Sequence, residues 1–125
     1  MRRLCGWHCR VAGNAQLRDF EFGFDSRGYA NVRPKHGEIV EGVLYEIDSE
    51  GLGMLDNFED YPEVFDRSEV RVIADEKLVT AWVYLKSIKE FGGIARMEYL
   101  ERVIRGAESN HLPENWIEKL KSFAH

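Results

Sequence analysis

The order of the hydrophobic patterns constrains the fold of this chain more than any other feature of its sequence. Alternation with a period of two, typical of strands with one buried face, recurs through the first two-thirds of the chain. Spacing of three and four residues, typical of amphipathic helices, dominates the end. Strands followed by helices, without the alternation that parallel βαβ units require, predict an α+β fold.

The first two strands are expected on either side of a turn at residues 25–28. Apolar residues alternate with polar or small ones from Asn14 to Phe24, which predicts a strand with one buried face. A second, short strand is expected over Tyr29–Pro34. Pro34 and Gly37 are expected to end it, because both residues commonly interrupt regular structure.

Three further strands are predicted in the middle of the chain. A long strand is expected over Glu38–Asp48, where Gly42 indicates a bulge or a close approach of another backbone. The segments Val64–Ala74 and Leu78–Leu85 are predicted to pair as a hairpin, joined by the polar turn Asp75–Lys77.

Three helices complete the prediction. A short helix is expected after Ser49, whose hydroxyl would cap it. A helix of roughly three turns is expected to begin near Ile94 and to end close to Gly106. A last amphipathic helix is expected to begin near Pro113. Its apolar residues are Trp116, Ile117, Leu120 and Phe123.

Length and composition indicate one domain over residues 1–125. With 125 residues and 44% hydrophobic residues, the chain has enough apolar material for one continuous core. A net charge of -5 argues against a nucleic-acid partner, because binding to the phosphate backbone needs a surplus of basic residues. We find no signal peptide and no apolar run long enough to cross a bilayer, so the expectation is a cytoplasmic protein without a membrane partner.

Metal and nucleophile motifs are not found. Cys5 and Cys9 enclose His8, but zinc sites typically need four ligands, so reduced thiols are expected. The histidines form no H-E-x-x-H pair, and the sequence has neither a G-x-S-x-G elbow nor a phosphate-binding loop. We therefore expect no metal and no nucleotide cofactor.

One acidic residue, Glu59, falls at an unexpected angle. In a helix that starts at Ser49, a rotation of roughly 100° per residue places Glu59 between Leu52 and Leu55, which are expected to face the core. Burial disfavours the ionised form of a carboxylate, so a buried Glu59 could take up and return a proton near neutral pH. Two alternatives remain open: Glu59 belongs to a solvated acidic helix end, or Asp56, about 60° away, is the inward acid.

Most aromatic side chains are expected in the core. They are Tyr45, Tyr61, Phe65, Trp82 and Trp116. Tyr84 is the exception, because a buried phenol in a strand needs a hydrogen-bond partner such as a carboxylate.

Several separated segments, taken in order, resemble the gamma-glutamylcyclotransferase-like family, whose small α+β proteins are built on a mixed β-barrel. The segment from Leu52 to Glu59 resembles the family's L-x-x-L-D-x-x-E signature. The other matching segments are Gly13-x-Ala15-x-Leu17 with Phe20-x-Phe22-x-Phe24, Gly28-x-Ala30-x-Val32-x-Pro34, Val40-x-Gly42-x-Leu44-Tyr45-x-Ile47, Phe65-x-Arg67-x-x-Val70-x-Val72, Ala81-x-x-Tyr84 and Leu112-Pro113-x-x-Trp116. The resemblance implies a mainly antiparallel, barrel-like sheet, a short helix carrying the catalytic acid, and two C-terminal helices.

The resemblance also implies a reaction. The α-amine of a small gamma-glutamyl substrate attacks its own γ-carbonyl, which forms 5-oxoproline and releases an amine or amino acid without a cofactor. The family's catalytic acid corresponds to Glu59. We expect Tyr84, Phe65 and Gly42 to bind the substrate, which could be a gamma-glutamyl amino acid, a gamma-glutamylamine or glutathione.

The sequence departs from the family in two respects, and one is Asp60, which replaces the Gly often found after the acid. Family members begin with a strand that ends in a Y-G-S-N or Y-G-T-L loop, and no such segment occurs between Met1 and the first predicted strand. Either the loop lies upstream of Met1, or this is a shortened member. A shortened member could be a non-catalytic binding or interaction protein, and a homodimer could cover the sheet edge that it leaves bare.

Overall fold

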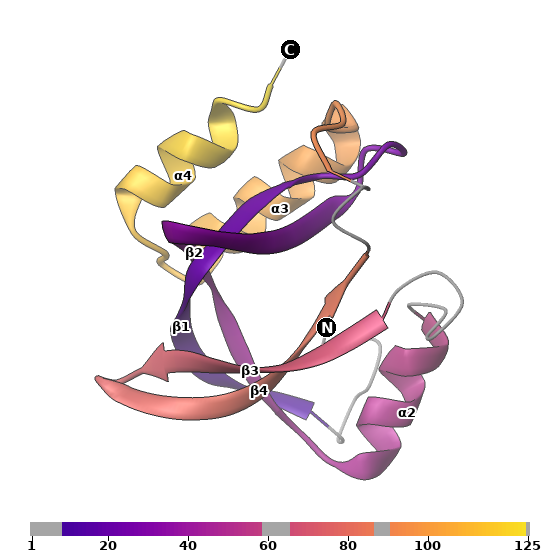
Figure 1. Cartoon of the computed structure of the whole chain (residues 1–125), viewed down its shortest axis with the longest axis vertical. Helices are drawn as coiled ribbons and strands as arrows, with labels where there is room; N and C mark the ends of the chain where they lie inside the picture. The colour runs from indigo at the N-terminus through magenta and orange to yellow at the C-terminus, as the bar shows by residue number, and fades with distance from the viewer. Residues whose placement is uncertain (1–8, 59–65, 87–90, 125) are drawn as a thin grey trace.

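The computed structural model describes residues 9–58, 66–86 and 91–124, and these form an α+β structure (Figure 1). The described strands and helices follow the predicted order. They are β1 (Cys9–Phe24), β2 (Ala30–Ile47), α2 (Ser49–Phe58), β3 (Asp66–Ala74), β4 (Lys77–Leu85), α3 (Met97–Ser109) and α4 (Glu114–Lys121). The predicted fold class is therefore confirmed.

The sheet is antiparallel, with the strand order β2-β1-β3-β4. β1 and β2 pair along almost their whole length, whereas β1 and β3 share the described pair Gln16 and Ile73. The two hairpins therefore cross and diverge, as Figure 1 shows, and β2 and β4 are left as the outer strands of the described sheet. The described sheet is open, so it does not close into the barrel that the family resemblance implies.

The predicted break between two strands does not occur, because β2 runs on through Pro34 and Gly37. Pro34 pairs with Phe20 in an outer strand, where a missing amide hydrogen is tolerated because one side of the strand has no neighbour in the sheet. Gly37 has a φ of 85° and donates its N–H to Oδ1 of Asp19, 2.9 Å away. These two residues therefore shape the strand without ending it.

A bulge at Asp19, and not at Gly42, interrupts the pairing of β1 with β2. The register shifts between Arg18 and Phe20, where Asp19 has a φ of 62°, and a second shift lies between Val11 and Gly13. Gly42 pairs regularly with Ala15, and a Cβ placed on it would meet no atom within 4 Å. The expectation of a bulge or a close approach at Gly42 is wrong.

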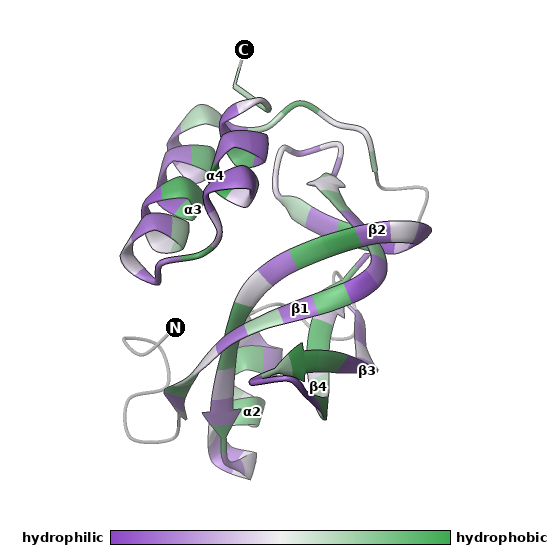
Figure 2. Ribbon diagram, turned by 90° about the vertical axis from the view of Figure 1, so that its left-hand side faces the viewer, coloured by the Kyte–Doolittle hydropathy of each residue, from purple (hydrophilic) through white to green (hydrophobic). Residues whose placement is uncertain are grey.

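The bulge at Asp19 divides β1 into two parts that pack in different regions of the core. Figure 2 shows how apolar and polar residues alternate along the strands. Before the bulge, Ala15 and Leu17 pack with Val72 of β3. After it, Phe22 and Phe24 pack against the C-terminal helices. One long strand therefore contributes to both the β3–β4 side and the helical side of the molecule.

The two C-terminal helices lie side by side against β1 and β2, at the opposite end of the molecule from α2 (Figures 1 and 2). Their buried cluster consists of Ala107, Leu112, Trp116, Ile117 and Leu120. α4 begins directly after Pro113, as predicted. α3 starts later than expected, at Met97, and continues past Gly106 to Ser109, because Asn110 and His111 end it. The amide of Asn110 donates to the Gly106 carbonyl, and His111 takes the left-handed conformation with a φ of 55°.

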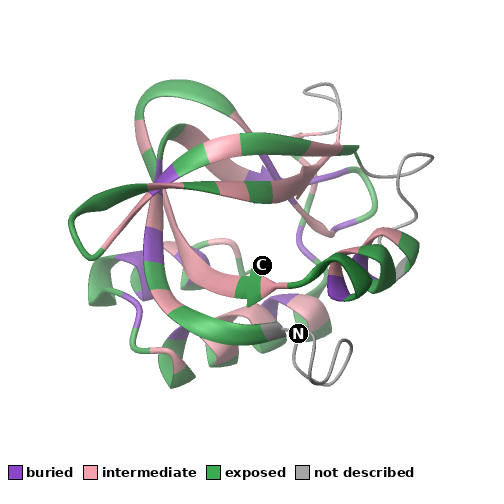
Figure 3. Cartoon of the chain, turned by 90° about the horizontal axis from the view of Figure 1, so that it is seen from below, coloured by how far each residue is buried: buried purple, intermediate pink, exposed green. Residues whose placement is uncertain are grey.

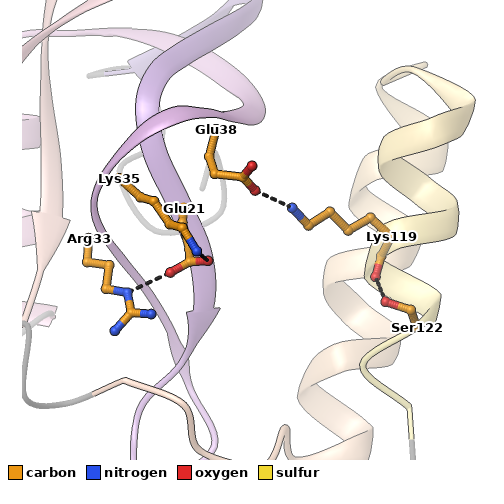
Figure 4. A network of polar contacts seen from close by, with 6 residues as sticks. All are labelled: Glu21, Arg33, Lys35, Glu38, Lys119 and Ser122. Atoms are coloured by element: carbon orange, nitrogen blue, oxygen red, sulfur yellow. Dashed lines mark hydrogen bonds and ion pairs between the residues drawn. The ribbon is translucent and has the colours of Figure 1, made fainter.

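Polar contacts join strands and helices around this core, as Figure 4 shows. Nζ of Lys119 on α4 lies 3.4 Å from Oε1 of Glu38 on β2. Within the β1–β2 hairpin, Nε of Arg33 lies 2.6 Å from Oε1 of Glu21, and Lys35 approaches the other oxygen. Burial raises the pKa of Glu21, but the hydrogen bonds and charges of Arg33 and Lys35 outweigh it and hold this pKa below its usual value.

A buried ion pair ties the end of β4 to the turn between β1 and β2. Asp25 is fully buried, and its Oδ1 accepts hydrogen bonds from the amides of Arg27 and Tyr29 at 2.9 and 3.0 Å. Its Oδ2 lies 2.8 Å from Nζ of Lys86, whose own amide donates to Oδ1 of Asn31. Desolvation raises the pKa of Asp25, but Lys86 and the two amides outweigh it and lower this pKa.

The segment before α3 crosses the same turn at very short range. The amide of Gly93 donates to the Phe24 carbonyl at 2.9 Å. A Cβ on Gly93 would overlap the carbonyl oxygen of Asp25, so only glycine fits without a backbone shift. Asp25 is therefore held by the hairpin, by the residue after β4 and by the approach to α3.

We predict that Gly93→Ala destabilises the protein by about 2–4 kcal/mol, because the added methyl group forces Gly93 and Asp25 apart. Urea unfolding measures the change. Gly106→Ala is the matched control, since it lies inside α3 and its Cβ would meet no atom within 4 Å. This control should gain up to about 1 kcal/mol from improved helix propensity. Equal effects of the two substitutions would contradict the close approach at Gly93.

We predict that Asp25→Asn costs about 3–5 kcal/mol at neutral pH, because it removes the buried negative charge that lies 2.8 Å from the largely buried Lys86. The pKa of Asp25 is lowered by folding, so its contribution is complete above the unfolded pKa of about 3.9. The contribution is lost as the pH falls from there through the lower folded pKa. Unfolding measured from pH 7 to pH 2 should therefore show a shallower acid decline for the variant. An acid decline as steep as that of the parent would contradict the assignment.

Candidate functional site

A cavity of about 800 Å³ opens between the second half of β2, α2 and β4. Most of its lining is apolar or aromatic, which is typical of sites for small organic ligands. The charged lining residues are Glu46, Asp75 and Lys77. The main apolar and aromatic lining residues are Val43, Leu44, Tyr45, Ile47, Leu52, Leu55, Val79, Trp82, Val83 and Tyr84.

The helix α2 forms one wall of this cavity. Its cap is Asp48 and not the predicted Ser49: Oδ1 of Asp48 accepts the Gly51 amide at 2.8 Å, and its carbonyl accepts the Leu52 amide at 2.9 Å. A carboxylate at this position also interacts favourably with the positive end of the helix dipole. Leu52 and Leu55 line the cavity as expected from their spacing, and Leu55 is only 5% exposed. Figure 3 shows the buried and exposed sides of this helix.

Tyr84 has the carboxylate partner that its strand position predicts. Its hydroxyl donates to Oδ1 of Asp56 on α2 at 2.6 Å. Nε of Arg67 lies 3.3 Å from the same oxygen. Arg67 and Tyr84 are directly opposite each other in the β3–β4 register, so the hydrogen bond and the ion pair come from neighbouring positions of the hairpin. This hairpin is confirmed, with a two-residue turn at Asp75 and Glu76.

The predicted aromatic residues that the structure describes lie either in the core or in the wall of the cavity. Trp116 is buried in the helical core, as expected, whereas Tyr45 and Trp82 line the cavity. Trp82 is 47% exposed, and the guanidinium carbon of Arg67 lies 4.6 Å from its ring centroid. This cation–π contact helps to orient Arg67. Tyr61 and Phe65 lie outside the described residues.

The structure places two of the four predicted site residues. Tyr84 lines the cavity, and Gly42 lies in β2, opposite Ala15 and one residue before the lining segment. Glu59 and Phe65 lie outside the described residues. Asp56, the alternative inward acid, is directed at the hairpin and engaged by Tyr84 and Arg67. Because its Oδ1 is occupied by two protein side chains, Asp56 is placed as an anchor between α2 and the hairpin.

The ion pair between Asp56 and Arg67 was not predicted from the sequence. The signal for it is the length of the turn between β3 and β4, which sets the register of the hairpin. The sequence predicts a turn of three residues, Asp75–Lys77. A two-residue turn at Asp75 and Glu76, both with positive φ, sets Arg67 opposite Tyr84. With this register, the carboxylate partner of Tyr84, Asp56, is also within reach of Arg67.

Two further observations concern the described residues. Within residues 9–58, 66–86 and 91–124, no group of three or more histidine, cysteine, aspartate or glutamate side chains could hold a metal ion. In the same ranges, none of the helices combines the length and the apolar character that a membrane crossing requires.

Comparison with known proteins identifies the family. Residues 1–102 match the family model "Gamma-glutamyl cyclotransferase, AIG2-like", so the chain belongs to this family. The matched region contains every strand of the described sheet and all the elements that line the cavity.

Two curated relatives from Drosophila melanogaster match a shorter stretch. "Putative gamma-glutamylcyclotransferase CG2811" is 37% identical over 55 residues, which is 43% of this chain and 35% of the relative. "Troponin C-akin-1 protein" is 38% identical over 55 residues, 42% of this chain and 33% of the relative. The chain thus spans about a third of the length of the curated relatives that it matches.

Solved structures agree over nearly the whole chain. A structure described as "Gamma-glutamyl cyclotransferase" is 26% identical, with a TM-score of 0.84 over 96% of this chain and 78% of that chain. The human uncharacterized protein loc79017 gives the same identity and TM-score, with 95% of this chain and 77% of that chain covered. YkqA from Bacillus subtilis shares the fold at 24% identity, with a TM-score of 0.81 over 97% of this chain and 45% of YkqA.

We predict that Leu55→Ala destabilises the protein by about 2–4 kcal/mol, because it removes a buried side chain between α2 and the sheet. Leu78→Ala on β4 is the control, since Leu78 is 66% exposed and its truncation should change stability by less than about 0.5 kcal/mol. Thermal or urea unfolding compares the two. A Leu55 variant as stable as the Leu78 variant would show that α2 does not depend on this packing.

Proposed function

We propose that this protein is a gamma-glutamylcyclotransferase that converts a small gamma-glutamyl compound into 5-oxoproline and a free amine or amino acid. The observation that carries the proposal is the family match over residues 1–102, which includes all the elements around the cavity. The cavity volume of about 800 Å³ is also within the range found for small-molecule sites.

In the proposed reaction, the α-amine of the substrate attacks the γ-carbonyl carbon of the same molecule. A new C–N bond closes a five-membered ring, and the bond to the leaving nitrogen breaks. Both reacting groups belong to one molecule, so ring closure already has a high effective molarity. The protein then has two tasks: to hold the substrate folded and to move one proton. This division of labour requires no cofactor.

We assign the proton transfer to Glu59. As general base it would deprotonate the α-ammonium, and as general acid it would return that proton to the leaving nitrogen. Two features support the assignment: Glu59 holds the acidic position of the L-x-x-L-D-x-x-E segment, and Asp56, the competing acid, is engaged by Tyr84 and Arg67. Phe65, Tyr84 and Gly42 are proposed to contact the substrate.

The proposal also covers the substrate class, the cellular location and the oligomeric state. Gamma-glutamyl amino acids, gamma-glutamylamines and glutathione all contain the reacting group, and the last would connect the protein to glutathione metabolism. We propose a cytoplasmic location for this chemistry and a single domain over residues 1–125. We further propose a homodimer that covers an outer strand of the sheet, which light scattering tests directly.

We predict that Glu59→Gln lowers 5-oxoproline release by at least about 100-fold, because the amide keeps the side-chain shape but cannot exchange the proton. The measurement is chromatographic detection of 5-oxoproline from gamma-glutamyl-L-alanine. Glu69→Gln is the control: it removes an exposed carboxylate on β3 and should leave the rate unchanged.

Two results would count against the proposal. A Glu59→Gln variant as active as the parent would exclude Glu59 as the acid and base. A parent that binds gamma-glutamyl-L-alanine without releasing 5-oxoproline would favour the alternative, a non-catalytic binding protein on the same fold.

A further inference from the structure

Asp56 carries a negative charge at a place where its own helix does not favour one. It lies in the last turn of α2, which contains no basic residue. The exposed carbonyl groups at this end give the helix a partial negative charge, so an unpaired carboxylate here is unfavourable. The stabilisation of Asp56 must therefore come from outside α2.

A hydrogen bond and an ion pair from the β3–β4 hairpin supply this stabilisation, and both involve Oδ1 of Asp56. The Tyr84 hydroxyl lies 2.6 Å from this oxygen, and Nε of Arg67 lies 3.3 Å from it. The side chains of Arg67 and Asp56 are only 18% and 21% exposed. A charge-assisted contact with this little water around it is stronger than an ion pair on the surface.

The helix needs such an anchor because its own sequence stabilises it poorly. α2 has ten residues, and two of them are Gly51 and Gly53. Short helices are marginal in water, and each glycine costs roughly 1 kcal/mol relative to alanine. Asp48 caps the first turn, and Asp56 fastens the last turn to the hairpin.

This anchor is coupled to the wall of the cavity. Tyr84 lines the cavity directly, and Arg67 packs on Trp82, which also lines it. Leu55, the neighbour of Asp56 in α2, also lines the cavity. A change at Asp56 therefore alters the distance between two walls without removing a lining side chain.

We infer that Asp56 is a positioning residue for the proposed cyclisation. Through Tyr84 and Arg67 it fixes the last turn of α2 against β3 and β4, so that the cavity keeps the shape in which the substrate reacts. This role rests on the proposed function, and it is separate from proton transfer, because the Asp56 carboxylate acts on two protein side chains.

The test is a double-mutant cycle with Asp56→Ala and Tyr84→Phe, measured as kcat and KM with gamma-glutamyl-L-alanine. Asp56→Ala should lower kcat about tenfold and change KM by less than about twofold, since misplacement of the reacting groups affects the chemical step. Tyr84→Phe keeps the ring that lines the cavity and removes only the hydroxyl that binds Asp56. The double variant should therefore also lose about tenfold, not about 100-fold, because both substitutions break the same contact. Asp56→Asn, which still accepts the Tyr84 hydrogen bond, should retain more activity than Asp56→Ala.

Asp48→Ala is the matched control, because it weakens the other end of α2 without touching Arg67 or Tyr84. It should lower the melting temperature while kcat stays within about twofold of the parent. If Asp56→Ala lowers kcat no more than this control, or if the two substitutions act additively, the positioning role is wrong.

The same assay separates this inference from the proposed function. An active parent, an inactive Glu59→Gln variant and unchanged Asp56 variants would overturn the positioning role alone. If the parent releases no 5-oxoproline, the proposed function and the catalytic role of Asp56 fall together. Amide hydrogen exchange of residues 50–58 then still tests the anchor itself: Tyr84→Phe should speed exchange in α2, and an unchanged rate would exclude the anchor.

Discussion

The buried ion pair between Asp25 and Lys86 is the contact on which the arrangement of the elements depends. A fully buried carboxylate is tolerated because Lys86 and two backbone amides satisfy it. Lys86 follows β4, Asp25 forms the β1–β2 turn, and Gly93 crosses that turn before α3. One carboxylate thus joins both hairpins and the start of the helical end of the molecule.

The cavity lies where the two hairpins separate and α2 covers the space between them. The sequence of this helix stabilises it poorly. The hairpins cross near Gln16 and Ile73 and then separate, and α2 covers the gap between the end of β2 and β4. Asp48 and Asp56 hold the two ends of this helix. The same fold therefore combines a rigid side, packed around Trp116 and Leu120, with a side whose geometry depends on a few polar contacts.

Much of this architecture could be predicted from local patterns. The hairpin from β3 to β4, the α4 helix after Pro113 and the need of Tyr84 for a carboxylate all follow from short-range rules. The sequence-based predictions are wrong where contacts with distant segments decide the local structure. β2 continues through Pro34 and Gly37 because the bulge at Asp19 on another strand accommodates them. Even so, the phase change between Leu17 and Phe20 marks that bulge in the sequence.

The sequence by itself determined the fold class, the order of the elements and the acidic segment from Leu52 to Glu59, because periodicity and motif spacing are local properties of the chain. Only the tertiary structure decided that the described sheet stays open and that Asp56 turns to the hairpin. It also decided that Asp25 is buried against Lys86, 61 positions further along the chain. Such choices depend on which charges and donors meet when distant segments pack, and no short stretch of sequence contains that information.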